Sequence, residues 1–154
     1  MDEHLMQRAL ALAAENVATG GGPFGAIVVK DGRLVGTGVN RVTAMHDPTA
    51  HAEVVAIRDA CANLGTFQLD GCDLYTSCEP CPMCLGAIYW ARPDRVFYAA
   101  SRHDAASAGF DDALIYDEIG LEPSARRIPF VHTPVAGTLR PFEVWNANDA
   151  KTRY

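Results

Sequence analysis

The spacing of apolar residues along the chain predicts several helices. Apolar side chains at every third or fourth position predict a helix over residues 2–18, with Asp2 as its N-cap. The same spacing predicts a second helix from an N-cap at Thr49 through residue 64, and a third that begins near Pro82. A further helix is expected over about residues 112–119.

Runs of β-branched and aromatic residues predict strands between these helices. The predicted strands cover residues 26–29, 34–39, 72–76, 96–99 and, near the C-terminus, 128–131. Asp31-Gly32 separates the first two strands and is a preferred two-residue hairpin turn. Because strands alternate with helices, the pattern indicates an α/β fold in which a sheet lies between helices.

The size and charge of the chain narrow the classes of function. Its 154 residues suit one compact domain, residues 1–154. A net charge of −6 at pH 7 offers no basic surface for phosphates, so we expect a small-molecule substrate and no nucleic acid. The chain has no apolar run near about 20 residues and no signal-peptide pattern at its N-terminus, so no membrane contact is expected.

The cysteines indicate a metal site. The chain has five cysteines, an odd number, and Cys78, Cys81 and Cys84 lie close together. Without a secretion signal, this clustering favours a metal ion over disulfides and a location in the reducing cytoplasm.

His51, Cys81 and Cys84 are the residues with the clearest chemistry, since imidazole and thiolate groups suit zinc. Three protein ligands leave a fourth position for water, as in catalytic zinc sites. Glu53 follows His51 by two residues, and Pro80 precedes Cys81. Together these residues match the pattern H-x-E…P-C-x-x-C, which is the signature of zinc-dependent nucleobase deaminases.

Both halves of this pattern lie where a helix is expected to begin. Cys81 and Cys84 are three residues apart and share one helical face, where the helix dipole stabilises thiolates in the first turn. His51 and Glu53 would diverge by about 200° inside a helix. At a helix N-terminus, both side chains can tilt toward a common ligand. We therefore expect two helix N-termini to face one metal ion.

An open zinc position indicates hydrolytic deamination. Zinc lowers the pKa of bound water toward ~7, which makes hydroxide available at neutral pH. Glu53 is expected to accept the water proton and to return it to a ring nitrogen of the substrate. Attack on an amidine-like carbon would then release ammonia.

The remaining cysteines and histidines have simpler interpretations. Cys78 could complete a closed Cys₃His site in a non-catalytic zinc-binding protein. Cys61 and Cys72 are expected to lie in the core. Four histidines have no motif partner and are expected at the surface or in ordinary hydrogen bonds: His4, His46, His103 and His132.

Four segments carry a family resemblance. Asp47–Glu53 is shared with tRNA adenosine deaminases and identifies the cytidine deaminase superfamily. Gly21–Ala26, Tyr75–Ala91 and Ala108–Asp112 more specifically resemble the bacterial guanine deaminases of that superfamily. The resemblance extends over nearly the whole chain. It implies a three-layer α/β/α sandwich around a five-stranded mixed sheet.

The resemblance also implies how a purine base is bound. Phe24 and Trp90 match aromatic residues that line the base pocket in this family, and Asn40 matches a residue that reads the purine. Asp112 matches a second proton shuttle near the exocyclic amine. Ala52 is grouped with these base-binding residues.

The resemblance further implies a homodimer that exchanges C-terminal segments, here about residues 139–154. A terminal tyrosine closes the partner's pocket in the family, and Tyr154 fits that position. Glu143 is a further candidate for a polar contact with the substrate. Glu79 is expected either to support the zinc ligands or to relay protons.

Together, these observations predict zinc-dependent conversion of guanine to xanthine and ammonia, with zinc hydroxide attacking C2. Glu53 would carry a proton to N3, and Asp112 would help the amine to depart. A tolerant pocket would also accept other amino-heterocycles, such as aminotriazines. The alternatives are deamination of adenosine in tRNA and a non-catalytic four-ligand zinc-binding protein.

Overall fold

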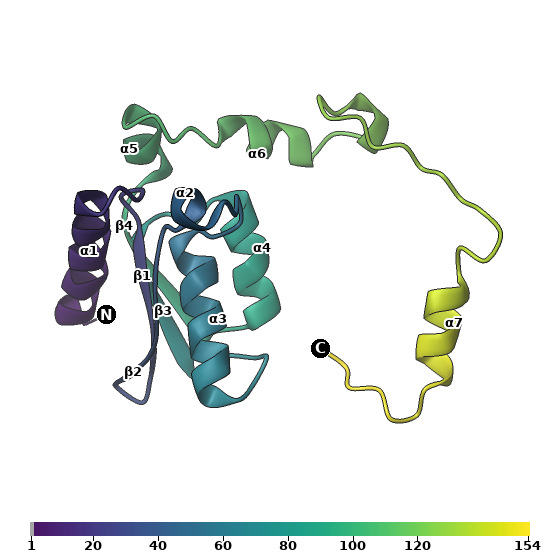
Figure 1. Cartoon of the computed structure of the whole chain (residues 1–154), viewed down its shortest axis with the longest axis horizontal. Helices are drawn as coiled ribbons and strands as arrows, with labels where there is room; N and C mark the ends of the chain where they lie inside the picture. The colour runs from purple at the N-terminus through teal and green to yellow at the C-terminus, as the bar shows by residue number, and fades with distance from the viewer. Residues whose placement is uncertain (1) are drawn as a thin grey trace. The chain divides into compact units, whose positions relative to one another are not determined.

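Twelve short elements make up the chain in the computed structural model, which describes residues 2–154 (Figure 1). In chain order they are α1 (Glu3–Ala18), β1 (Gly25–Lys30), β2 (Arg33–Val39), α2 (Val42–Met45), α3 (Ala52–Leu64), β3 (Cys72–Cys78), α4 (Pro82–Ala91), β4 (Arg95–Ala100), α5 (Arg102–Ser107), α6 (Ala113–Ile119), the 3₁₀ helix η1 (Pro123–Ala125) and α7 (Arg140–Ala147). None of these helices has the length and apolar content needed to span a bilayer.

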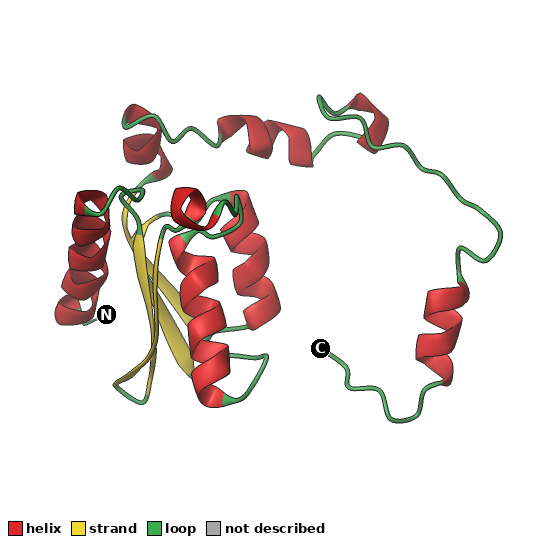
Figure 2. Cartoon of the chain, in the orientation of Figure 1, coloured by secondary structure: helices red, strands yellow, loops and turns green. Residues whose placement is uncertain are grey.

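The strands form one mixed sheet in the order β2-β1-β3-β4 (Figure 2). β1 is antiparallel to β2 and to β3, whereas β3 is parallel to β4. A parallel pair needs a crossover connection, which α4 provides between β3 and β4. A hairpin joins β1 to β2, and the chain passes through α2 and α3 before it returns to the sheet as β3.

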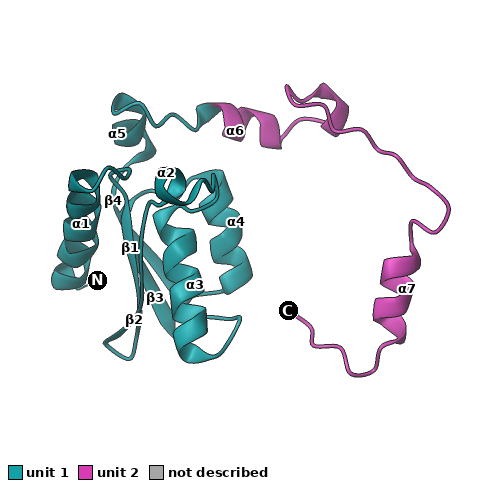
Figure 3. Ribbon diagram, viewed as in Figure 1, with its two compact units in different colours: residues 1–113 teal, residues 114–154 magenta. Residues whose placement is uncertain are grey.

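The chain divides into two compact units, residues 1–113 and 114–154 (Figure 3). The first unit contains the sheet and α1 to α5, whereas the second contains α7 and most of α6. The second unit thus begins well before the segment 139–154 that the sequence suggests for exchange between subunits.

Two apolar clusters hold the first unit together, one on each face of the sheet. Met6 and Ala9 of α1 pack against Ile27 of β1 on one face. On the other face, α3 and α4 pack against the sheet around Val28 and Leu74. Burial of apolar surface contributes about 25 cal/mol per Å², so these two clusters supply most of the driving force for this fold.

Two glycines allow α3 to lie unusually close to β2. A methyl group at Gly38 would overlap the backbone of α3 at Ala52, and one at Gly36 would lie 2.6 Å from the Ala60 side chain. The backbone of the helix therefore rests directly on the strand. This contact fixes where α3 begins, immediately after His51.

The predicted order of elements is confirmed for the first unit, including the Asp2 cap, whose side chain accepts a hydrogen bond from the backbone N–H of His4. The predicted N-cap of α3 is wrong: His51, not Thr49, is the cap residue. The Thr49 hydroxyl and backbone N–H both donate to the Asp47 carboxylate instead, which forms a local turn.

The prediction of a fifth strand is also wrong, because the sheet in residues 2–154 has four strands. Residues 128–131 form an irregular segment in which Ile128 is 73% and Val131 81% exposed. Pro129 lacks a backbone N–H, so this segment is poorly suited to a strand inside a sheet. Three helices, α2, α5 and α7, were not predicted, since each has at most eight residues.

Candidate metal centre

The two sequence motifs meet where two helices begin. His51 is the N-cap of α3 and Cys81 is the N-cap of α4, and both have extended backbone conformations. Cys84 follows in the first turn of α4, after Pro82 at the first helical position. Because His51 precedes the helix, the divergence expected for two residues inside a helix does not separate it from Glu53.

The three predicted ligands form a tight cluster. The Nδ1 atom of His51 lies 3.5 Å from the sulfur atoms of both Cys81 and Cys84. All three ligand atoms lie within 4.8 Å of one another. Tetrahedral zinc, with Zn–S near 2.3 Å and Zn–N near 2.0–2.1 Å, would separate sulfur and nitrogen by about 3.6 Å. The donor set and its spacing therefore fit a zinc ion.

The thiols of Cys81 and Cys84 have pKa values that are shifted in opposite directions. Cys81 has its pKa lowered to about 4, first because the Cys84 thiol donates a hydrogen bond to it and then because His51 lies beside it. The pKa of Cys84 is raised by the same hydrogen bond and by burial. The pKa of His51 is raised chiefly by its hydrogen bond with Cys81. One sulfur is thus already negative, and a metal ion has to displace the Cys84 proton.

Glu53 borders this cluster but is not one of its three ligands. Its side chain is buried, and its Oε2 atom lies 3.5 Å from the sulfur of Cys84. Burial raises the pKa of the Glu53 carboxyl above its ordinary value. A buried carboxyl with a raised pKa beside an open metal position suits a group that takes up and returns protons.

Phe24 and Asp112, two of the predicted site residues, belong to segments that contact each other. The Phe24 ring packs edge-on against Phe110, with ring centroids 4.9 Å apart and planes at 87°. Phe110 lies two residues before Asp112, so this contact ties the Asp112 segment to the start of β1. Burial, followed by the nearby Cys81 charge, raises the pKa of Asp112. Asp112 therefore lies within electrostatic range of the zinc ligands.

Asn40 lies just after β2, and its Oδ1 atom accepts a hydrogen bond of 3.3 Å from the Val42 N–H. The amide group keeps two N–H donors and a second lone pair on its oxygen for other partners. Ala52 is fully buried at the first position of α3.

Glu79 lies in the loop between β3 and α4, and its carboxylate accepts a hydrogen bond of 3.0 Å from the Arg102 N–H. This bond holds the start of α5 beside the cysteine loop. Trp90 lies six residues beyond Cys84, about 9 Å along the axis of α4, and is 66% exposed. A role for Trp90 in the pocket stays a prediction, as does a proton relay through Glu79.

Two predicted residues belong to the second unit. Glu143 lies in α7 and forms an exposed ion pair of 3.5 Å with Arg140. Tyr154 ends the chain and is largely exposed. Contacts of either residue with a substrate stay predictions.

Sequence analysis missed one buried polar residue in this region. Asn16, in the last turn of α1, is 7% exposed, and its side chain bonds to the backbone at Gly22 and at Asn40. A signal was present, because Asn16 lies three residues after Ala13 on the apolar face of the helix. A polar residue on a buried face needs a hydrogen-bond partner.

Cys78 lies outside the metal cluster formed by the described residues. Its thiol donates to the backbone carbonyl of Ser101 at 3.5 Å, and burial raises its pKa to about 11. This protonated thiol supports the end of β3 and not a metal ion. The geometry therefore disfavours the closed four-ligand site.

We expect Cys78→Ser to keep about one zinc per chain, because the serine hydroxyl can replace the thiol as a donor to Ser101. Metal analysis of the purified variant measures this, with Cys81→Ser as the matched control that should lose zinc. Release of zinc from both variants would instead support four ligands.

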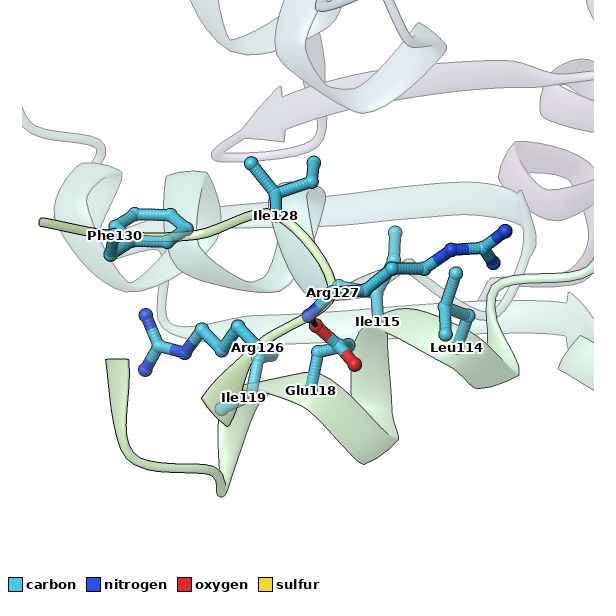
Figure 4. Close-up of a pocket in the computed structure, with 8 residues that line it drawn as sticks. All are labelled: Leu114, Ile115, Glu118, Ile119, Arg126, Arg127, Ile128 and Phe130. Carbon is cyan, nitrogen blue, oxygen red and sulfur yellow. Dashed lines mark hydrogen bonds between the residues drawn. The ribbon is translucent and has the colours of Figure 1, made fainter. Parts of the chain in front are cut away.

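The second unit has an apolar cavity of its own, of about 590 Å³ (Figure 4). Its lining residues are Leu114, Ile115, Glu118, Ile119, Arg126, Arg127, Ile128 and Phe130. The guanidinium group of Arg126 lies over the Phe130 ring, 5.0 Å from its centroid. The lining contains neither histidine nor cysteine, so this cavity is not a zinc site.

Comparison with known proteins gives consistent matches for the whole chain. Residues 1–100 match the model of the cytidine and deoxycytidylate deaminase zinc-binding region. The chain is 58% identical over 153 residues to the guanine deaminase of Bacillus subtilis, covering 99% of this chain and 98% of that protein. An X-ray structure of guanine deaminase from Bacillus subtilis superposes with a TM-score of 0.98 at 57% identity, covering 100% of this chain and 99% of that one.

More distant matches cover less of the chain. A guanine deaminase structure from Nitrosomonas europaea has a TM-score of 0.69 at 39% identity, covering 73% of this chain and 65% of that one. The tRNA-specific adenosine deaminase of Aquifex aeolicus is 42% identical over 98 residues, which is 64% of this chain and 65% of that protein.

Proposed function

This chain belongs to the bacterial guanine deaminases of the cytidine deaminase superfamily, and we propose that it hydrolyses guanine to xanthine and ammonia. One observation carries this proposal: the match to a guanine deaminase extends over both units, whereas the match to a tRNA-specific adenosine deaminase covers 64% of the chain. The match to the guanine deaminase therefore includes residues that the match to this tRNA-specific adenosine deaminase leaves out.

His51, Cys81 and Cys84 would hold the zinc ion and leave its fourth position open. Zinc bound there acts as a Lewis acid that lowers the pKa of a coordinated water to about 7. The start of α3 and the start of α4 hold the ligands on either side of this position. The positive ends of both helix dipoles stabilise the negative charge that collects there.

In the proposed reaction, Glu53 accepts a proton from the attacking water and delivers it to N3 of guanine, while the new bond forms at C2. Asp112 donates a proton to the exocyclic amine, and the C2–N bond breaks to release ammonia. The hydroxyl group at C2 returns a proton to Asp112 as the carbonyl of xanthine forms. The raised pKa of each carboxyl supports these roles, because a general acid needs a pKa near the working pH.

The base is proposed to lie against Phe24, with the Asn40 amide bonded to its edge. The Phe24 ring is held by Phe110 and by the core, so it offers a rigid apolar surface for a purine. Asn40 offers both donor and acceptor groups to the base edge. Ala52, Trp90 and Tyr154 complete the proposed pocket, and an aminotriazine that fits it would be a secondary substrate.

The experiment that tests this function is ammonia release from zinc-analysed protein given guanine, adenine, cytosine, cytidine and adenosine side by side. Guanine alone should respond. Formation of inosine in tRNA with no release from guanine would instead support the alternative, adenosine deamination, which the net charge of −6 disfavours.

We also propose that two copies of this chain form a homodimer by exchanging their C-terminal segments. The proposed location of this dimer is the reducing cytoplasm. None of residues 114–154 is buried, and large apolar side chains there are exposed, including Phe142 and Val144. An extended apolar surface of this kind is typical of a segment that docks on another chain. In the described residues β4 is an edge strand, which offers unpaired backbone groups to such a segment.

Removal of the last few residues, including Tyr154, should lower guanine turnover more than it lowers the melting temperature. The reason is that Tyr154 is proposed to close the partner's pocket, whereas its side chain is 70% exposed in its own chain. Turnover and thermal melting of the truncated chain measure the two effects. Full activity of the truncated chain would show that the tail only packs.

A further inference from the structure

We propose that Asn16 is a positioning residue that fixes the two residues assigned to the base, Phe24 and Asn40. This inference rests on the proposed function, since it assumes that these two residues contact the purine. Asn16 itself lies in α1, outside every motif that carries the zinc chemistry.

The side chain of Asn16 joins two separate segments of backbone. Its Nδ2 atom donates to the carbonyl oxygen of Gly22 at 2.8 Å and to that of Asn40 at 2.9 Å. An amide nitrogen has two N–H groups, and here each one has a carbonyl acceptor. Only an amide or a comparable two-donor group can satisfy both carbonyls from this position.

These bonds complete a closed ring of hydrogen bonds around the base-binding residues. The Phe24 N–H donates to the Gly22 carbonyl at 2.8 Å, and the Asn40 N–H donates to the Phe24 carbonyl at 3.1 Å. Asn16 then links the Gly22 carbonyl to the Asn40 carbonyl. The Asn16 side chain therefore holds the Asn40 backbone directly and the Phe24 backbone through the Gly22 carbonyl.

The glycine loop before β1 is shaped around this amide. A methyl group at Gly21 would overlap the Asn16 amide nitrogen, and one at Gly22 would lie 3.1 Å from the side-chain carbon Cγ of Asn40. The Gly21 N–H also donates to the backbone carbonyl oxygen of Asn16 at 2.9 Å. The close approach explains why consecutive glycines are needed here, and it makes Gly21 an independent way to disturb Asn16.

Asn63 is a matched control for this role. Its Nδ2 atom, on α3, donates to the carbonyl oxygen of Val35 at 2.9 Å, near the other end of β2. Asn63→Ala thus removes a bond of the same kind, from a helix side-chain amide to a backbone carbonyl. This bond lies near the end of β2 that is farther from Asn40. A merely structural role for Asn16 would make the two alanine variants behave alike.

The test compares Asn16→Ala, Gly21→Ala and Asn63→Ala as zinc-loaded proteins. We expect the first two to raise KM for guanine by about tenfold and to change kcat by less than about threefold. Asn63→Ala should leave both constants near those of the unmodified chain, although it lowers the melting temperature. A normal KM in Asn16→Ala, or an equal rise in Asn63→Ala, would overturn the inference.

Amide hydrogen exchange separates this inference from the proposed function, because it needs no substrate. Exchange at Phe24 and Asn40 should accelerate in Asn16→Ala and in Gly21→Ala and stay unchanged in Asn63→Ala. If the unmodified chain releases no ammonia from guanine, the proposed function fails, while the exchange rates still decide whether Asn16 holds these residues. Unchanged exchange in Asn16→Ala would refute the positioning role.

Discussion

Replacement of Glu53 by glutamine should leave about one zinc per chain and lower guanine turnover by at least about a hundredfold. Glutamine has nearly the same shape and fits the buried position, but it cannot accept the water proton. Glu53 is not one of the three clustered ligands, so the metal has no reason to leave. Xanthine formation and zinc content, measured on the same sample, test both halves of this expectation.

Glu79→Gln is the matched control. Its carboxylate accepts a hydrogen bond from the Arg102 N–H, and a glutamine oxygen can accept the same bond. Turnover should therefore stay within about threefold of the unmodified chain if this bond is the main role of Glu79. Near-normal turnover in Glu53→Gln would remove Glu53 from the reaction, and a large loss in Glu79→Gln would favour a proton relay.

Replacement of Cys84 by alanine should abolish both zinc binding and turnover. Cys84 is fully buried within the cluster, and two remaining ligands cannot complete a tetrahedral site. Metal analysis and the ammonia assay measure the loss, and circular dichroism should show that the fold is retained. A variant that still holds one zinc per chain would contradict the proposed ligand set.

The same ligand set gives zinc binding a definite dependence on pH. Zinc requires a neutral imidazole and deprotonated thiols, so protons compete with it. The hydrogen bond that His51 donates to the Cys81 sulfur raises the pKa of His51, so this competition begins at a higher pH than for an ordinary histidine. Zinc occupancy at limiting metal should therefore fall as the pH falls.

The sequence was most informative where chemistry and periodicity coincide. Cys81 and Cys84 could be placed near one another because their spacing of three matches the helical repeat. In the structure Cys81 is the N-cap of α4, Cys84 lies in its first turn, and both sulfur atoms belong to one cluster. The runs of β-branched and aromatic residues that predicted β1 and β3 likewise reflect burial against helices on both faces. In each case, neighbouring residues in the chain determine the local geometry.

The errors arose where a competing local partner or a distant segment decides the structure. Thr49 has the chemistry of an N-cap, yet the carboxylate of Asp47 takes its hydroxyl, and His51 caps the helix without a side-chain bond. Residues 128–131 have the composition of a strand, but they pair with no strand of the sheet in residues 2–154, and Pro129 lacks the N–H that such pairing uses. Asn16 was overlooked because its partners lie 6 and 24 residues away.

The close seating of α3 on Gly36 and Gly38 has a consequence for how the metal is acquired. The start of α3 is ordered by apolar packing against the sheet, so the imidazole is held near its final place before any ion arrives. In small zinc-dependent domains, by contrast, the ion has to fold the chain. Here the ion is needed for catalysis and not for folding. A chelator should therefore yield an intact, inactive apoprotein that zinc can restore.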